Sequence, residues 1–108
     1  MRKLDVFAKQ PGSKPYHTAI SDNLKNLQRF VGGPIETFQI TNDFLIICNE
    51  NGKIDGKSQY NCTILGEQLF GPLIFCGCDG EDFDDVPIKW EVFKAVLPEL
   101  FRKETNYA

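Results

Sequence analysis

Residues 21–40 read SDNLKNLQRFVGGPIETFQI, and this stretch decides the fold because it contains the start and end of a helix and leads into a strand. At its start, short polar side chains can accept a hydrogen bond from the free N–H groups of a first helical turn: Ser21, Asp22 and Asn23. Apolar residues then recur at steps of three and four, which places them on one helix face: Leu24, Leu27, Phe30 and Val31. The stretch therefore predicts an amphipathic helix.

Glycine and proline mark the end of this helix. Gly32 can adopt the left-handed conformation that closes a helix, and Pro34 prevents its continuation. The predicted helix has about three turns. Because so short a helix is not stable alone, we expect it to pack on a sheet. The alternation of Glu36, Phe38 and Ile40 with polar residues predicts that a strand follows it.

Length and composition indicate one globular domain over residues 1–108. The chain is 42% hydrophobic and 25% charged, which suffices for a packed core. The net charge of −3 provides no positive field, so we do not expect a nucleic-acid partner. No apolar run approaches the roughly 20 residues of a membrane span, and the first residues lack the apolar core of a signal peptide. We therefore expect a cytoplasmic protein with no membrane partner.

Alternating and continuous apolar runs predict the strands. Residues 3–9 and 16–20 alternate on either side of Pro11-Gly12, which predicts a hairpin. The run FLIICN at 44–49 is apolar almost throughout, as is typical of a strand buried on both faces. We expect this strand in the middle of the sheet. Asn51-Gly52 follows it directly and predicts a tight hairpin turn.

A second apolar run, residues 69–76, contains Pro72. Proline cannot donate to a ladder of hydrogen bonds, so this run is predicted at a sheet edge or at a bulge. A C-terminal helix is predicted from large apolar residues at steps of three and four: Trp90, Phe93, Val96, Leu97, Leu100 and Phe101. Pro98 predicts a kink or break near Val96, and residues 103–108 are expected to fray.

Together these elements predict an α+β fold. We expect a mixed or antiparallel sheet of about four or five strands with two helices packed on it. Asp84 or Asp85 could cap the C-terminal helix. The oligomeric state stays open.

Several motifs of this chain resemble those of one family. They are V-G-G-x-I-E at 31–36, C-N-E-N-G-K-I-D-G at 48–56, Asn61, Gly71, and D-x-E-D-F at 79–83. They resemble a family of short proteins catalogued as a domain of unknown function, DUF3846, over nearly the whole chain. The resemblance implies a setting in phages, plasmids and conjugative elements. It implies no catalytic residues, because the family has no established activity.

Cysteine and histidine are the residues from which a metal site or a nucleophilic enzyme would be built. Cys48, Cys62, Cys76 and Cys78 are expected as reduced thiols. Only the last two are close in sequence, which does not match the paired spacing of zinc ligands. A nucleophilic thiolate needs a base, and the chain's one histidine is His17 in the first hairpin. We expect neither a metal or other cofactor nor an enzyme, with zinc and a Cys–His enzyme as alternatives.

Acidic residues are concentrated before the C-terminal helix, where five of the fifteen lie between Asp79 and Asp85. They do not match the twelve-residue calcium loop. Their simplest interpretation is a solvated loop that caps the helix. The functional interpretation is a negative patch that docks a basic partner protein, with Phe83 as its apolar anchor. The predicted contact residues are Asp79, Glu81, Asp82, Phe83, Asp84 and Asp85.

A second polar stretch follows the FLIICN strand. A hairpin turn explains most of it, but loops that leave central strands are also where ligands bind. The candidate ligand contacts are Asn49, Glu50, Asn51, Lys53 and Asn61. The placement of charge predicts a non-catalytic binding module that acts through the acidic loop. The setting implied by the resemblance suggests that it antagonises a host or element-encoded protein. The alternative is a protein that binds or sequesters a nucleotide or signalling metabolite.

Overall fold

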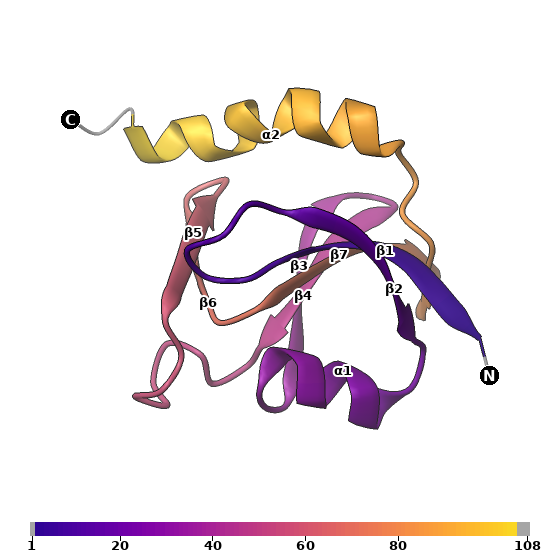
Figure 1. Ribbon diagram of the computed structural model, residues 1–108, viewed down its shortest axis with the longest axis horizontal. Helices are drawn as coiled ribbons and strands as arrows, with labels where there is room; N and C mark the ends of the chain where they lie inside the picture. Colours follow the sequence, from indigo (N-terminus) through magenta and orange to yellow (C-terminus); the bar gives the residue numbers. More distant parts are fainter. Residues whose placement is uncertain (1, 106–108) are drawn as a thin grey trace.

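The computed structural model describes the backbone of residues 2–105 and the side chains of residues 2–98. Within these limits the chain forms eight strands and two helices (Figure 1). In chain order they are β1 (Lys3–Lys9), β2 (Tyr16–Ser21), α1 (Leu24–Val31), β3 (Ile35–Thr41), β4 (Phe44–Asn49), β5 (Tyr60–Ile64), β6 (Glu67–Phe70), β7 (Leu73–Asp79), β8 (Asp82–Asp84) and α2 (Trp90–Thr105). The predicted α+β class and the two helices are confirmed.

The main sheet of the described chain has six strands in the order β2-β1-β7-β4-β3, with β8 paired to β7. All of its pairings are antiparallel. Strands β5 and β6 form a separate two-stranded antiparallel sheet. The main sheet lies between α2 on one face and α1 on the other (Figure 1). It is larger than predicted because the acidic stretch adds β8.

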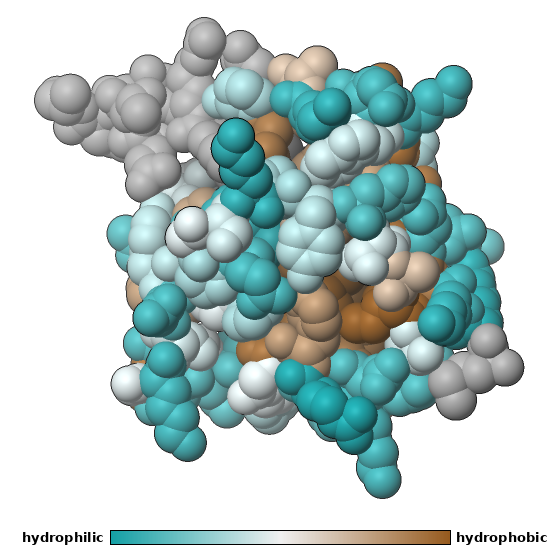
Figure 2. All heavy atoms as spheres, in the orientation of Figure 1, coloured by the Kyte–Doolittle hydropathy of each residue, from teal (hydrophilic) through white to brown (hydrophobic). Residues whose placement is uncertain are grey.

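Apolar side chains fill both sides of the main sheet, because neighbouring residues of a strand point to opposite faces. The core on the α2 side includes Phe7, Phe44, Ile46, Phe75 and Phe93. The core on the α1 side includes Leu4, Leu27, Val31, Ile47 and Ile74. On the face drawn in Figure 2, apolar residues gather between α1 and the sheet, and hydrophilic residues cover most of the rest.

Helix α1 begins and ends where the sequence predicts. Asn23 is the N-cap, and its side-chain oxygen accepts a hydrogen bond of 2.9 Å from the N–H of Asn26. Gly32 closes the helix with a φ of 94°. The eight residues between these two caps make about two turns, so the predicted ends are correct but the expected length of about three turns is too long. Leu27 is buried in it, whereas Leu24 remains 56% exposed at its first turn.

The central strand of the sheet is β7 rather than β4. Every residue of β4 is buried, as its apolar run predicts, but β7 has β1 on one side and β4 on the other. The prediction that Pro72 places its run at an edge is wrong. Gly71, with a φ of 79°, divides that run, so that Leu69 belongs to β6 and β7 begins at Leu73. Pro72 therefore precedes the strand, where its missing N–H interrupts no ladder.

The predicted hairpin turn at Asn51-Gly52 does not form. Asn51 instead starts a compact loop in which its carbonyl oxygen accepts hydrogen bonds from the N–H groups of Ile54 and Asp55. Gly52 is buried in this loop, and a Cβ there would lie 3.1 Å from the carbonyl oxygen of Phe70. The chain then enters β5, which belongs to the second sheet.

Helix α2 contains Pro98 and continues to Thr105, so the predicted break near Val96 does not occur. The helix starts at Trp90, and the carbonyl oxygen of Lys89 accepts a hydrogen bond from the N–H of Phe93. The predicted caps, Asp84 and Asp85, lie before this start and bond elsewhere. Neither helix within residues 2–105 is long and apolar enough to cross a membrane.

Some predictions for the C-terminus concern residues beyond these limits. The side chains of Leu100 and Phe101 lie outside the described residues, as do positions 106–108 of the predicted frayed tail. Residues 103–105 belong to α2.

The outer edge of the sheet at β3 carries an irregularity. The register between β3 and β4 shifts between Gln39 and Thr41, as in a β-bulge. The side-chain amide of Gln39 donates a hydrogen bond of 2.6 Å to the carbonyl oxygen of Thr41.

Candidate functional site

The acidic stretch forms a hairpin rather than a loop that caps a helix. Strand β7 ends at Asp79, Gly80 turns the chain with a φ of 65°, and β8 returns with Asp82 opposite Asp79. Asp79, Glu81 and Asp82 are exposed on this hairpin. Its turn therefore concentrates carboxylates at one corner of the sheet.

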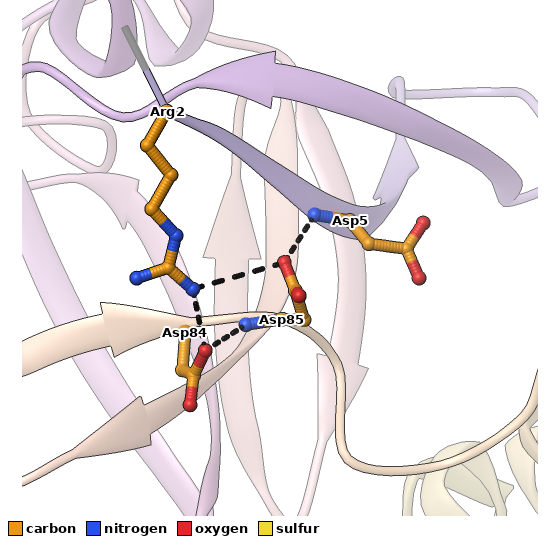
Figure 3. A network of polar contacts seen from close by, with 4 residues as sticks. All are labelled: Arg2, Asp5, Asp84 and Asp85. Atoms are coloured by element: carbon orange, nitrogen blue, oxygen red, sulfur yellow. Dashed lines mark hydrogen bonds and ion pairs between the residues drawn. The ribbon is translucent and has the colours of Figure 1, made fainter.

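The last two carboxylates of the stretch hold this hairpin against β1 (Figure 3). Nη2 of Arg2 lies 2.6 Å from Oδ1 of Asp84 and 4.0 Å from Oδ1 of Asp85. The N–H of Asp5 donates to Asp85 at 2.8 Å, and the N–H of Asp85 donates to Asp84 at the same distance. The Asp85 N–H first, and Arg2 second, hold the pKa of Asp84 below its ordinary value. Both carboxylates therefore have a structural role.

Phe83 does not stand out from the hairpin as an apolar anchor. In β8 it pairs with Cys78 of β7. Side chains of a strand alternate between faces, so Phe83 points away from the side taken by Asp82 and Asp84. Its half-buried ring packs against the apolar core on the α1 side of the sheet.

Two neighbouring depressions adjoin the hairpin and are together called the docking surface here, after the function proposed for them below. An acidic hollow of about 430 Å³ includes four aspartates among its lining residues: Asp43, Asp79, Asp84 and Asp85. An apolar groove of about 290 Å³ lies between α2 and the β3–β4 turn. It is lined mainly by Ile40, Phe44, Ile88, Val92 and Val96. Asp43 and Pro87 line both depressions, so charged and apolar surface are continuous.

Close packing of the backbone brings these segments together. A Cβ on Gly77 would clash with the carbonyl oxygen of Asp85, so only glycine lets residue 85 cross β7 this closely. The carbonyl oxygen of Asp43 accepts a hydrogen bond of 3.2 Å from the N–H of Cys78. Sequence reasoning missed Asp43, because nothing in a turn between two strands signals that it lies beside residues 79–85.

A third depression, called the rear groove here, lies between the β3–β4 strands and the β5–β6 sheet, with a volume of about 460 Å³. Asn49, Glu50 and Lys53 of the predicted ligand contacts line it, whereas Asn51 and Asn61 are not among its lining residues. Nζ of Lys53 lies 2.7 Å from Oε2 of Glu67, another lining residue.

The amide of Asn49 is committed to the fold of the adjoining loop. Its Oδ1 accepts a hydrogen bond of 2.9 Å from the N–H of Asn51, and its Nδ2 donates to Asp55 at 3.4 Å. Asp55 in turn accepts hydrogen bonds of 2.8 Å from the N–H groups of Lys57 and Ser58 and from the Ser58 hydroxyl. These donors, led by the Ser58 N–H, hold the pKa of Asp55 below its ordinary value.

Asn61 is buried away from the rear groove and joins the two sheets. Its Nδ2 donates to the carbonyl oxygens of Lys9 at 2.9 Å and of Gly71 at 2.8 Å. Its Oδ1 accepts a hydrogen bond of 2.7 Å from Nζ of Lys9, which is itself buried. Asn61 therefore satisfies buried polar groups at the end of β1.

The cysteines occupy opposite sides of the main sheet. Cys48 and Cys62 belong to the core on the α2 side, and Cys76 and Cys78 pack on the α1 side. No disulfide joins any of the four. Burial raises the pKa of Cys48 to about 11 and that of Cys76 to about 12. Among the described side chains, no group of three or more His, Cys, Asp and Glu is arranged to hold a metal ion.

His17 contacts both β1 and the start of α2. Its Nε2 lies 2.6 Å from Oδ1 of Asp5, and its ring is nearly parallel to that of Trp90, with centroids 6.1 Å apart. It also meets Phe7 edge-on at 5.3 Å. These contacts connect the first hairpin to the start of α2.

No curated protein and no solved structure matches the chain. A family model described as "Domain of unknown function (DUF3846)" matches residues 1–95. The matched part includes the acidic hairpin, the rear groove and the first turn of α2. As its motifs predict, the chain belongs to the DUF3846 family.

Proposed function

We propose that this protein is a non-catalytic binding module that docks a basic, partly apolar segment of another protein on its docking surface. The observation that carries the proposal is the continuity of the acidic hollow with the apolar groove through Asp43 and Pro87. A surface of this kind combines electrostatic attraction with apolar burial, the two terms that most interfaces use.

The charges define the partner. Asp43, Asp79, Asp84 and Asp85 line the hollow, while Arg2 lies against the last two. Excess negative charge attracts Lys and Arg side chains, which raises the rate of association and discriminates against acidic partners. The turn residues Glu81 and Asp82 extend the same negative field.

The apolar groove supplies the affinity in this proposal. Val92 and Val96 of α2 are 47% and 39% exposed, although both line it. Because Phe83 packs inward, the apolar anchor has to come from the partner and enter the groove beside α2. Burying such a side chain contributes about 1.5–3 kcal/mol to the free energy of binding.

The family resemblance supports a biological setting for this interaction. If the chain is carried by a phage, plasmid or conjugative element, its partner is a host or element-encoded protein in the cytoplasm. An acidic surface can antagonise such a protein by occupying a groove that otherwise binds nucleic acid.

A defined peptide tests the chemistry of this surface. The probe is a synthetic amphipathic helix of lysine and leucine, with a glutamate-leucine peptide as its opposite-charge control. Fluorescence anisotropy should show binding of the first peptide only, weakened by added salt. The double substitution Asp43→Asn with Asp79→Asn should lower the affinity roughly threefold to tenfold, and Val92→Ser roughly tenfold.

The matched control is the double substitution Glu36→Gln with Glu67→Gln in the rear groove, which changes the net charge by the same amount. It should leave the affinity for the peptide unchanged. Equal binding of both peptides, or equal losses in the two double variants, would refute the docking surface. A protein captured from the host qualifies as the partner only if its direct affinity falls with the same substitutions.

A further inference from the structure

We propose that the rear groove is a second, separate site, which binds a small organic cation consisting of a primary amine on an aromatic or branched apolar body. The inference rests on the shape of the groove, on the charges around it and on the rigidity of its walls. It does not depend on the docking surface.

The shape suits a small molecule. The volume of about 460 Å³ falls within the range of roughly 300–1,000 Å³ that is common for ligand sites. Phe38, Leu69 and Phe70 supply apolar wall. Ile54 also lines the groove and is 82% exposed, so it is available to cover a bound apolar body.

The charges select a cation. The lining residues include three glutamates, Glu36, Glu50 and Glu67, and a single basic residue, Lys53. A phosphate would meet this excess of negative charge, which disfavours the nucleotide ligands considered from the sequence. An amine would instead find carboxylates beside aromatic rings, the combination that favours organic cations.

The interactions of Lys53 indicate how the groove stabilises an ammonium group. It is held at 2.7 Å from Glu67. The hydrogen bond to Glu67, and then the charges of Glu67 and Glu36, raise the pKa of Lys53. A ligand amine would pair with Glu36 or displace Lys53 from Glu67, so Lys53 acts as an internal competitor.

The walls are held in place before any ligand arrives, which lowers the entropic cost of binding. Strand β4 is buried along its whole length. The loop beyond it is fixed by the hydrogen bonds of Asn49 and Asp55. Cys48 lines the groove with a pKa of about 11, so its thiol is protonated at neutral pH and does not capture ligands covalently.

Three probes of similar shape and different charge test the site: phenethylamine, phenethyl alcohol and hydrocinnamate. Each is titrated into the full chain while backbone amide chemical shifts are followed by NMR. The expected affinity order is cation, neutral molecule, anion. The largest shifts should fall on Glu36, Cys48, Lys53 and Glu67. An anion that binds as tightly as the amine, or shifts confined to other surfaces, would overturn the proposal.

Substitutions provide the sharper test. Glu67→Gln and Glu36→Gln should each lower the affinity for phenethylamine about threefold, whereas Lys53→Met should raise it about threefold. A factor of this size corresponds to the energy of an exposed ion pair. Glu81→Gln and Lys25→Met make the same charge changes elsewhere and should leave the affinity unchanged. If Lys53→Met has no more effect than Lys25→Met, Lys53 does not compete with the ligand and the assignment fails. The amide spectra report whether each variant remains folded.

Discussion

The carboxylate of Asp55 accepts hydrogen bonds from two consecutive N–H groups, those of Lys57 and Ser58, and from the Ser58 hydroxyl. It also accepts a hydrogen bond from the side-chain amide of Asn49. This arrangement resembles the Asx turns in which an aspartate replaces a backbone acceptor. At the residue scale, the polar side chains after β4 serve first to fold the loop that walls the rear groove.

This role predicts a pH dependence. Hydrogen bonds hold the pKa of Asp55 below its ordinary value of 3.8, so its contribution to stability is present above that value and is lost as the pH falls through the folded-state pKa. Asp55→Ala should therefore lower the free energy of unfolding at neutral pH, and the difference from the unmodified protein should narrow in acid. Urea titrations at about pH 7 and about pH 3 measure it. A difference that stays constant would contradict this role.

At the element scale, local signals predicted α1 and its caps well, because Asn23 and Gly32 act on adjacent backbone groups. The position of β7 could not be found in this way. Its apolar run is interrupted by Gly71 and Pro72, and its central place depends on pairing with β1 and β4, which are distant in sequence. The hairpin expected at Asn51-Gly52 failed for a similar reason, since β4 pairs instead with β3 and β7.

The turn between β5 and β6 gives a prediction for an element. Leu65 has a φ of 52° and Gly66 a φ of 84°, so both turn residues have positive angles as in a type I′ hairpin. Leucine is strained in this region by roughly 1–2 kcal/mol, whereas asparagine tolerates it. Leu65→Asn should therefore raise the free energy of unfolding by about 1 kcal/mol. Thermal and urea unfolding test this gain.

Gly66→Ala provides the opposite control, because a Cβ at that φ is unfavourable whatever the surrounding space. It should lower the melting temperature. If Leu65→Asn lowers it as well, the side chain of Leu65 contributes more through its contacts than its backbone costs.

At the scale of the whole molecule, the sequence indicated only the acidic half of the proposed docking surface. The acidic run was visible as a cluster, but Asp43, Ile40 and Val92 come from three other elements or turns and meet the hairpin only after folding. The inward packing of Phe83 was not predicted. It follows from the alternation of side chains along β8, a strand that was not predicted from the sequence. Composition reveals charge density, whereas the partners of each charge depend on tertiary structure.

Asn61 tests how the two sheets are joined. Asn61→Ala would remove the partner of Nζ of Lys9 and of the carbonyl oxygens of Lys9 and Gly71. Leaving buried polar groups without hydrogen bonds should cost on the order of 2–4 kcal/mol. Urea unfolding measures this loss. Asn51→Ala, at an exposed amide, is the matched control and should cost less than about 0.5 kcal/mol. If the two substitutions lower the free energy of unfolding equally, the hydrogen bonds of Asn61 do not hold the two sheets together.

The bulged edge at β3 has a consequence for solution behaviour. A straight, unpaired strand at the edge of a sheet can pair with a strand of a second molecule, which extends the sheet and can start a fibril. Here the register shift between Gln39 and Thr41 bends that border, and the Gln39 amide already occupies one of its carbonyl acceptors. We therefore expect the chain to tolerate high concentration without polymerising along this border.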